Sequence, residues 1–464
     1  MDVVINQIHT LSTKNDSDLK KLKDFLRHEQ ETLKANANQI DQALQMLDPA
    51  VNTLGVAFLL AAQLSAGGSR PASTSPAAAA AGAAAAAGAS TGAAPATPSA
   101  VADQRQTFAY VGAFLRAADE QQVKKGSVPV NTVCKCYAQM AIDEGRQAML
   151  RSLGPLQCAL EKLRPNAETL TPVHAEFLRV CLHAKAYHLG SRVLQQPIFD
   201  ISLSSSNCTQ MTPQSFLCYF YYGAMVHIGM KEYSAAMRLL LVVLTCPASC
   251  LSTIQADAYK KYVLVSLKVH GELQALPVYA SHIVQRYAKI PSYALDVAEA
   301  FKQGDAAALQ RVIEEKASAI EADSNMGLAK QVAASLQRHK LQTLTKTYLT
   351  LSLGEIAREI GFEEAETRKV EDLLFSMISD GEINARIDQS TGNVSFEDDI
   401  DDMDVGMVSK MQGKLQNILG LAQRIASFEQ EVVSSEAYIR KTAALEGGAA
   451  GAVPALGGYD FMDM

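Results

Sequence analysis

Cysteine and histidine are the residue types through which this chain would hold a metal ion or attack a substrate. Eight cysteines and nine histidines are scattered along its 464 residues. The spacings typical of zinc enzymes and zinc fingers, H-x-H, H-E-x-x-H and C-x-x-C, do not occur. Cys134 and Cys136 lack a second nearby Cys/His pair, and His183 and His188 are five residues apart, a spacing that does not place both on one helical face. We therefore expect no metal ligand and no cofactor, and we interpret the cysteines as reduced thiols of a cytosolic or nuclear protein.

Motifs for phosphate chemistry are also missing. The patterns G-x-x-x-x-G-K-[ST] and G-x-G-x-x-G do not occur. A cysteine–histidine pair that meets only in the folded chain stays open at this stage, because such groups are assembled from distant positions. Helical solenoids seldom present such pairs, so we predict a chain without catalytic residues.

A run of four aromatic residues would be the platform if this chain stacked nucleic-acid bases. The run is Tyr219, Phe220, Tyr221 and Tyr222, and no series of arginines or lysines accompanies it. Because four successive residues point all round a helix, we predict that this cluster packs between helices.

Residues 101 to about 323 predict helix after helix, with no convincing alternating strand. Gly223, Ala235 and Pro247 are spaced twelve and twelve apart, as in a tetratricopeptide repeat, which predicts helices over residues 215–228 and 233–244. The neighbouring units match less well and indicate a degenerate α-solenoid with a concave surface for partners. Breaks between helices are expected near residues 126–129 and 154–155 and at Pro165, Pro172, Pro197, Pro213, Pro247, Pro277 and Pro291.

The N-terminal part divides into helices and a low-complexity segment. Residues 1–64 predict paired helices with a break at Asp48 and Pro49. The apolar run at residues 54–64 is shorter than the roughly 20 residues of a membrane span, and the first residues lack a signal-peptide pattern, so we expect no membrane association. Residues 65–100 are rich in Ala, Pro and Gly and almost uncharged, which predicts a disordered insert.

Residues 344–396 contain three segments of different period. Ser352 and Glu355 have the spacing of a capping box at the start of a helix that ends at Gly361. A second helix carries apolar residues from 370 to 378. Apolar and polar residues then alternate at residues 383–387 and 394–396, which predicts two strands with a turn between them. Together with a preceding helix over about 328–347, these segments predict a winged helix with a two-stranded hairpin.

Charge argues against a winged helix that reads DNA. Residues 363–380 hold six acidic and two basic residues, and residues 397–404 hold six acidic residues in eight positions. This charge would repel a duplex, because neutralising phosphates dominates nucleic-acid affinity. We therefore expect no binding of nucleic acid and favour a role in protein assembly.

A stripe of apolar residues follows the acidic segment at 4-3-4-3 spacing, with Glu429 interrupting it. The spacing is close to that of a coiled coil. A long helix with one apolar stripe needs a partner, and the sequence leaves open whether its own winged helix or helices of other chains supply it. We call the stripe the C-terminal seam; it consists of Met411, Leu415, Ile418, Ala422, Ile425 and Val432.

Several stretches resemble the PCI domain, a winged-helix domain shared by the proteasome lid, the signalosome and a translation initiation complex. They are NMGLAKQ at 325–331, LTKTYLTLSL at 344–353, and DGEI at 380–383 with a wing ending in VSF at 394–396. FLCYFYYG at 216–223 and DAYKKYVLVSL at 257–267 are similar to the third-subunit family of the COP-nine signalosome. The resemblance covers residues 175–396 well and the N-terminal helices loosely.

The resemblance implies a non-catalytic scaffold of the signalosome, which removes a ubiquitin-like modifier from the cullins of cullin–RING ligases. It implies that the isopeptidase lies in another subunit, that the protein is found in cytoplasm and nucleus, and that it contacts cullin–RING ligases only indirectly. Direct partners would be other signalosome subunits. We expect contacts between PCI domains, with outward Asn384 and Arg386 on the wing edge pairing with a neighbour's sheet, and a shared bundle of C-terminal helices that contains the C-terminal seam. A subunit of the proteasome lid or of the initiation complex is the alternative, and a DNA-binding regulator is less favoured.

The predicted fold class is mostly α: a TPR-like α-solenoid, a winged-helix (PCI) domain and a long C-terminal helix. The expected parts are N-terminal helices at 1–64, the insert at 65–100, helical repeats at 101–325, the winged helix at 326–398 within a PCI domain of about 205–398, an acidic linker and bundle helix at 399–445, and a flexible tail at 446–464.

Overall fold

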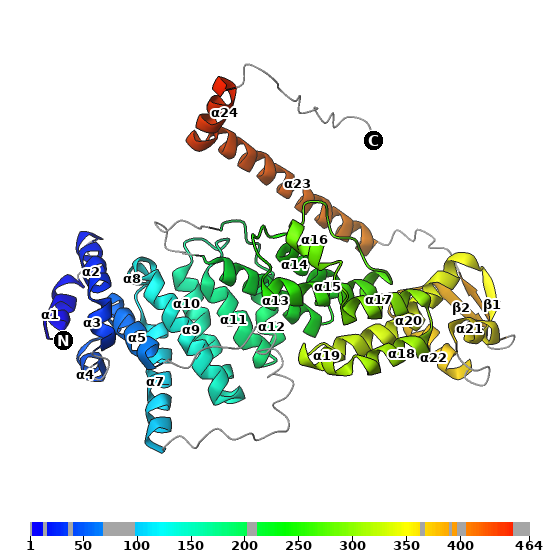
Figure 1. The fold of residues 1–464 in the computed structure, drawn as a ribbon, viewed down its shortest axis with the longest axis horizontal. Coiled ribbons are helices and arrows are strands. Elements are labelled where there is room, and N and C mark those ends of the chain that lie inside the picture. The colour runs from blue at the N-terminus through cyan, green and yellow to red at the C-terminus, as the bar shows by residue number, and fades with distance from the viewer. Residues whose placement is uncertain are drawn as a thin grey trace. The chain divides into compact units, whose positions relative to one another are not determined.

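The computed structural model describes residues 2–12, 16–35, 40–67, 98–201, 211–361, 367–388, 392–396 and 405–448. Within these residues the chain is mostly helical, with one small sheet, as the sequence predicts (Figure 1). The chain divides into two compact units. The first comprises Met1–Tyr348 and Ser352–Met377, and the second comprises Leu349–Leu351 and Ile378–Met464.

The first unit begins with five helices, of which the last is strongly apolar. They are α1 (Asp2–Leu11), α2 (Asp16–His28), α3 (Gln30–Ala35), α4 (Ile40–Met46) and α5 (Thr53–Gly67). Helix α5 is apolar on all sides and packs against α2, α3, α4 and α9, so the run at residues 54–64 is a buried helix, as predicted. No described helix is long and apolar enough to span a membrane.

The insert predicted at residues 65–100 lies mostly outside the described residues. Helix α5 extends to Gly67, and α7 (Pro98–Ala117) begins at Pro98, so the described chain stops at 67 and resumes at 98. The acidic run at 397–404 and residues 449–464 of the predicted tail also lie outside the described part.

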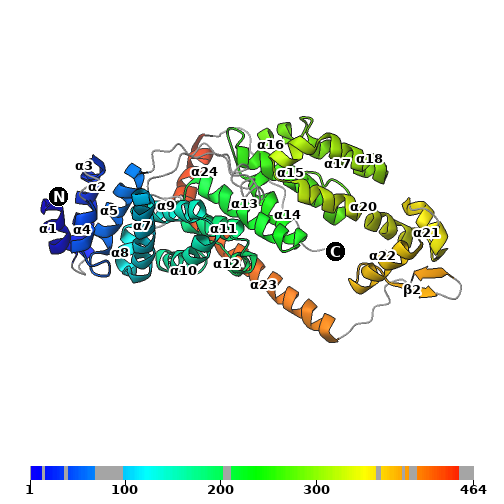
Figure 2. The same cartoon turned by 90° about the horizontal axis from the view of Figure 1, so that it is seen from below.

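Successive helices of the first unit pack on their neighbours in sequence order, which is the arrangement of a helical-repeat array (Figure 2). Helix α9 packs on α10, α11 on α13, α13 on α14 and α14 on α15. After α7 the array comprises α8 (Glu120–Lys125), α9 (Ser127–Glu144), α10 (Arg146–Leu163), α11 (Pro172–His183), α12 (Tyr187–Leu194), α13 (Pro213–Gly229), α14 (Tyr233–Thr245), α15 (Thr253–His270), α16 (His282–Tyr287), α17 (Tyr293–Gln303), α18 (Ala306–Glu315) and α19 (Ala317–Ala322).

The repeat predicted from Gly223 is confirmed as the helix pair α13 and α14. A Cβ atom at Gly223 would lie 3.2 Å from Leu239 Cδ1 on α14 and 2.8 Å from Leu194 Cδ2 on α12. The missing side chain therefore lets α13 approach helices on two sides.

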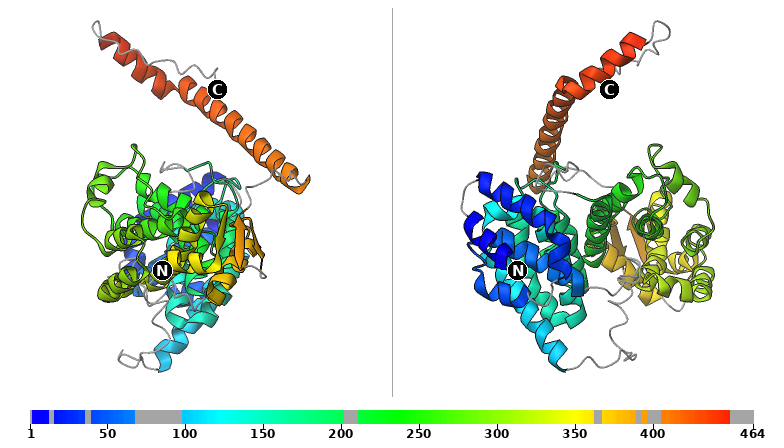
Figure 3. Two further views of the ribbon diagram at one scale, coloured as in Figure 1. Left: turned by 90° about the vertical axis from the view of Figure 1, so that its right-hand side faces the viewer. Right: turned by 60° about the vertical axis from the view of Figure 1, so that its left-hand side comes forward.

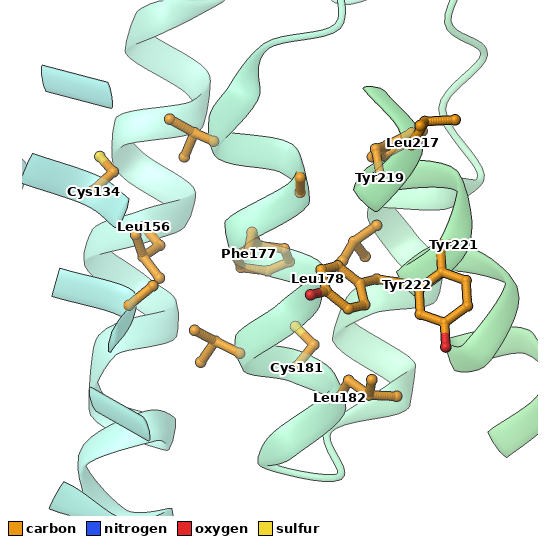
Figure 4. Close-up of a cluster of buried hydrophobic side chains, with 14 of the residues drawn as sticks. Cys134, Leu156, Phe177, Leu178, Cys181, Leu182, Leu217, Tyr219, Tyr221 and Tyr222 are labelled. Carbon is orange, nitrogen blue, oxygen red and sulfur yellow. The ribbon is translucent and has the colours of Figure 1, made fainter. Parts of the chain in front are cut away.

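The aromatic run of α13 lies in the core of the array, as predicted (Figure 4). Tyr219, Tyr221 and Tyr222 are buried, and Tyr219 makes an edge-to-face contact with His174 of α11 at a centroid distance of 5.9 Å. In Figure 4 the Tyr222 ring points toward Leu178 of α11, whereas the Tyr221 ring points to the other side of α13. The Tyr221 ring centroid lies 5.8 Å from Lys261 Nζ of α15, so the aromatic run packs between helices.

One predicted break is wrong. Helix α10 continues through Gly154 and Pro155. Proline lacks the N–H that would bond to the carbonyl of residue 151. Burial of Pro155 itself, and of Leu153 and Leu156 beside it, offsets this loss, because α9 and α11 pack on either side. The other expected breaks fall at helix starts or in connections.

The elements after residue 325 follow the order predicted for a winged helix. The helices are α20 (Met326–Thr347), α21 (Leu353–Ile360) and α22 (Thr367–Ser379). Ser352 Oγ accepts from the Glu355 N–H at 3.3 Å, and the Glu355 carboxylate accepts from the Ser352 N–H at 3.1 Å, so the predicted capping box is present. Gly361 ends α21 in the left-handed conformation, with φ of +94°.

The sheet of the second unit has three strands, not the two that the sequence predicts. They are β1 (Thr350–Ser352), β2 (Ala385–Asp388) and β3 (Asn393–Phe396), in the order β1-β3-β2. Strand β1 has only three residues, the last of which, Ser352, also caps α21, so it is too short for alternation to reveal it. The Phe396 N–H donates to the Leu349 carbonyl at 2.8 Å.

The C-terminal part contains two helices, although the sequence predicts one. Helix α23 (Val405–Ser434) ends before Ser435, and α24 (Glu436–Gly448) follows it at an angle (Figure 3). Ser435 Oγ accepts from the Tyr438 N–H at 3.4 Å, which starts the new helix.

Candidate partner-binding surfaces

Three of the cysteines are held in the thiol form by burial. Burial raises the pKa of the Cys181 thiol to about 12 and that of Cys218 to about 11, and it raises the pKa of Cys134 further. These thiols stay protonated, whereas nucleophiles and metal ligands are thiolates. In the described part of the chain, no three His, Cys, Asp or Glu side chains are placed to share a metal ion. Cys208 lies outside it.

His183 and His188 belong to different helices. His183 ends α11, and His188 lies in the first turn of α12 and is exposed. Burial lowers the pKa of His183, with Arg179 as a smaller cause. The two imidazoles therefore have separate surroundings, and among the residues that the structure describes neither belongs to a group of side chains that could hold a metal ion.

Arg386 lies where the period-two pattern places it. It is exposed on β2 and pairs with Ser395 on β3, while Ile387 of β2 pairs with the buried Val394. Asn384 is exposed too, but it precedes β2 and is not part of the strand. The polar face of this hairpin is thus oriented outward as predicted.

The order of the strands places β1 and β2 at the two edges of the sheet among the described residues. Strand β3 lies in the middle, so β2 has a strand partner on one side only among the described residues. Its other edge presents backbone N–H and C=O groups that a further strand can bind. This geometry suits strand addition, and the short strand with the charged Arg386 is also typical of an edge protected from aggregation.

All six residues of the C-terminal seam lie on α23 and are exposed. The exposed fraction is 53% for Met411, 60% for Leu415 and Ile418, and 66% for Ile425. Ala422 and Val432 are also exposed. Isolated apolar residues on a surface are ordinary, but a row along one helix is typical of a binding face.

The apolar face of α23 is wider than the sequence interpretation held. At 100° per residue, Val408, Leu419 and Val433 flank the seam on one side, and Leu421 and Phe428 flank it on the other; all are exposed. The opposite side carries polar residues such as Gln416 and Gln423. Two residues per heptad suit one partner helix, whereas this broader stripe suits several. The breadth of this face can be read from the sequence when α23 is plotted at 100° per residue, but heptad spacing alone does not reveal it.

A buried polar network ties α20 to the repeat array within the first unit. Lys261 Nζ donates to Asn325 Oδ1 at 2.7 Å, and Asn325 Nδ2 donates to Tyr293 Oη at 2.7 Å. Tyr293 Oη donates to Asp323 Oδ2 at 2.9 Å. Burial lowers the pKa of Lys261 to about 8. The sequence alone does not reveal this network, because Lys261 and Asn325 are 64 residues apart.

Comparison with known proteins connects these surfaces to a family. A family model described as "COP9 signalosome complex subunit 3, N-terminal helical repeats" matches residues 16–284, and one described as "PCI domain" matches residues 309–398. COP9 signalosome complex subunit 3 of Drosophila melanogaster is 28% identical over 451 residues, covering 94% of this chain and 93% of the fly protein. The Arabidopsis thaliana protein of the same name is 29% identical over 444 residues, covering 95% and 93%. The first match spans more than half of the chain and coincides with the helical-repeat array, so the chain belongs to the COP9 signalosome complex subunit 3 family.

Proposed function

We propose that this chain is a non-catalytic scaffold subunit of a COP9 signalosome and supports the removal of a ubiquitin-like modifier from cullins by another subunit. Family membership supports the assembly, and the observation that carries the scaffold role is the broad exposed apolar face of α23. We also propose that the protein is located in cytoplasm and nucleus and that its domains have the boundaries expected from the sequence. Its contact with cullin–RING ligases would be indirect.

In this proposal α23 enters a bundle formed with helices of sister subunits. A fully buried Leu or Ile contributes about 1.5–3 kcal/mol relative to an exposed one. Burial of several of these side chains against partner helices would therefore stabilise the complex by several kcal/mol. Charge introduced at the centre of the face would have to be buried unpaired, which is costly.

The test introduces Leu415→Asp and Ile418→Asp together in a tagged chain expressed in cells. We expect recovery of the sister subunits by affinity purification to fall about tenfold or more, since each 1.4 kcal/mol is tenfold in affinity. The matched control, Gln416→Asp with Gln423→Asp, adds the same charge on the polar side of α23 and should leave recovery unchanged. Recovery of the whole complex at normal stoichiometry by the first variant would reject the bundle contact.

The open edge of β2 is the second proposed contact, with a strand of a neighbouring PCI domain. Replacing Arg386 with Glu reverses the exposed charge beside that edge, and we expect loss of one neighbouring subunit. Arg311→Glu on α18 is the control for charge reversal alone. Mass spectrometry of the purified complexes identifies the subunit that is lost; an unchanged subunit list for Arg386→Glu would argue against this contact.

Depletion of the chain tests the link to cullins. Cells that lack it should accumulate modified cullin, and re-expression should reverse this, whereas the purified chain alone should not release the modifier. Release by the isolated chain would overturn the non-catalytic role. Purification with proteasome-lid or initiation-complex subunits would instead favour those assemblies.

A further inference from the structure

Helices α7, α9 and α10 enclose a pocket of about 620 Å³, apart from the surfaces described above. Arg105, Phe108, Gly112 and Arg116 line it from α7 at steps of three or four residues, so they share one face of that helix. Eleven residues at 1.5 Å each place the two arginine positions about 16 Å apart. The pocket is therefore an elongated groove with an arginine near each end of its α7 wall, and Arg151 lines it from α10.

The groove is positively charged. Arg105, Arg116 and Arg151 are exposed, and none has an ion pair or a side-chain hydrogen bond within the described residues. Glu144 is the one carboxylate that lines the groove among those residues, so three positive charges face one negative charge. A guanidinium carries five N–H donors in a planar fork that matches a carboxylate or phosphate.

Tyr137 of α9 lines the same groove and is 2% exposed. Its ring stacks on Phe108 at a centroid distance of 4.7 Å. A Cβ atom at Gly112 would lie 2.9 Å from Tyr137 Oη, so the absence of that side chain makes room for the hydroxyl. Within the described residues this hydroxyl has no hydrogen-bond partner. Burial raises the pKa of Tyr137 to about 12, so the group stays protonated and can donate to an anion.

We propose that this groove binds an extended acidic peptide segment of a partner protein, held by Arg105, Arg116 and Arg151 and by the Tyr137 hydroxyl. An extended chain rises about 3.3 Å per residue, so about five residues match a length of about 16 Å. A compact anion would reach only one end of the groove and leave the opposite arginine without a partner. Length therefore favours the peptide over a free phosphate.

The experiment measures fluorescence anisotropy of fluorescein-labelled hexaglutamate with the full chain at low salt. We expect binding that weakens as salt rises and that falls at least about tenfold when Arg116→Glu and Arg151→Glu are combined, because reversed charge repels the carboxylates. Arg238→Glu, at an exposed position of α14, is the matched control and should change affinity less than about twofold. Tyr137→Phe removes only the hydroxyl and should weaken binding by several-fold.

Three results would overturn the proposal. Equal affinity of the native chain and the double reversal, or equal binding of labelled hexaglutamine, would show that the groove does not hold carboxylates. Displacement of the peptide by pyrophosphate at lower concentration than by unlabelled hexaglutamate would show a site for compact anions instead. Circular dichroism and thermal melts establish that each variant folds, and Arg116→Gln with Arg151→Gln repeats the test with a milder change if the reversal does not fold.

Discussion

At the scale of single residues, His174 shows how burial fixes a protonation state. It lies in the first turn of α11 and is 2% exposed. Its Nδ1 atom accepts from the Thr171 N–H at 3.1 Å, which caps the helix. Burial lowers the pKa of His174 to about 4, partly opposed by the Thr171 carbonyl oxygen, which lies 3.2 Å from Nδ1 and favours a proton there. The neutral ring is therefore part of the fold, and a proton on Nδ1 would break the cap.

The folded protein should lose stability on acidification because of His174. The folded pKa lies below the unfolded value of about 6.5, so the contribution is present above pH 6.5 and is lost as pH falls toward 4. At 1.36 kcal/mol per pKa unit, the loss approaches about 3 kcal/mol. Urea unfolding at several pH values measures how the free energy of unfolding depends on pH. Between pH 6.5 and 4 this free energy should fall less steeply in His174→Gln than in the native chain. If the free energy of unfolding fell equally with pH in both proteins, the loss of stability could not be assigned to His174.

A second residue-scale prediction concerns the close approach at Gly223. Gly223→Val should destabilise the first unit by about 1–3 kcal/mol, since added carbons would overlap Leu194 and Leu239. Thermal melts measure the change, and Gly327→Val, where a Cβ atom meets nothing within 4 Å, controls for helix propensity. An equal effect of both substitutions would mean that packing at Gly223 is unimportant.

At the scale of elements, features encoded in neighbouring residues were predictable. The capping box of Ser352 and the ends of α13 and α14 depend on local spacing, and the outward Arg386 depends on period two. Features that depend on distant partners were not. Strand β1 exists because it pairs with β3, and α10 passes Pro155 because neighbouring helices hold it. The width of the α23 face and the arginine groove were missed because single motifs do not reveal faces assembled from several turns or helices.

The network around Asn325 should control how firmly α20 is attached to the array. Asn325→Ala leaves the buried Lys261 ammonium without its 2.7 Å partner. We expect a loss of about 2–4 kcal/mol in the free energy of unfolding, because a buried charge that loses its hydrogen bond keeps its desolvation cost. Gln310→Ala, at an exposed position of α18, should cost less than about 0.5 kcal/mol. Equal unfolding curves for the two variants would show that the network contributes little.

At the scale of the whole molecule, the chain combines a helical-repeat array, a small sheet with an open edge and a helix with a broad apolar face. Its described parts contain surfaces suited to partners and no constellation suited to metal chemistry. Repeat arrays present extended surfaces, and amphipathic helices are stabilised mainly by what they pack against. These features support the proposed scaffold role, in which α23 is the principal contact.

Whether α23 is covered by partner subunits can be measured by hydrogen exchange in the free chain and in the purified complex. The amides of residues 408–432 should exchange quickly in the free chain, because an unpacked helix opens readily, and should become at least about a hundredfold slower in the complex. Amides of α15, buried within the array, should exchange alike in both samples. Equal exchange of residues 408–432 in the two samples would contradict the account.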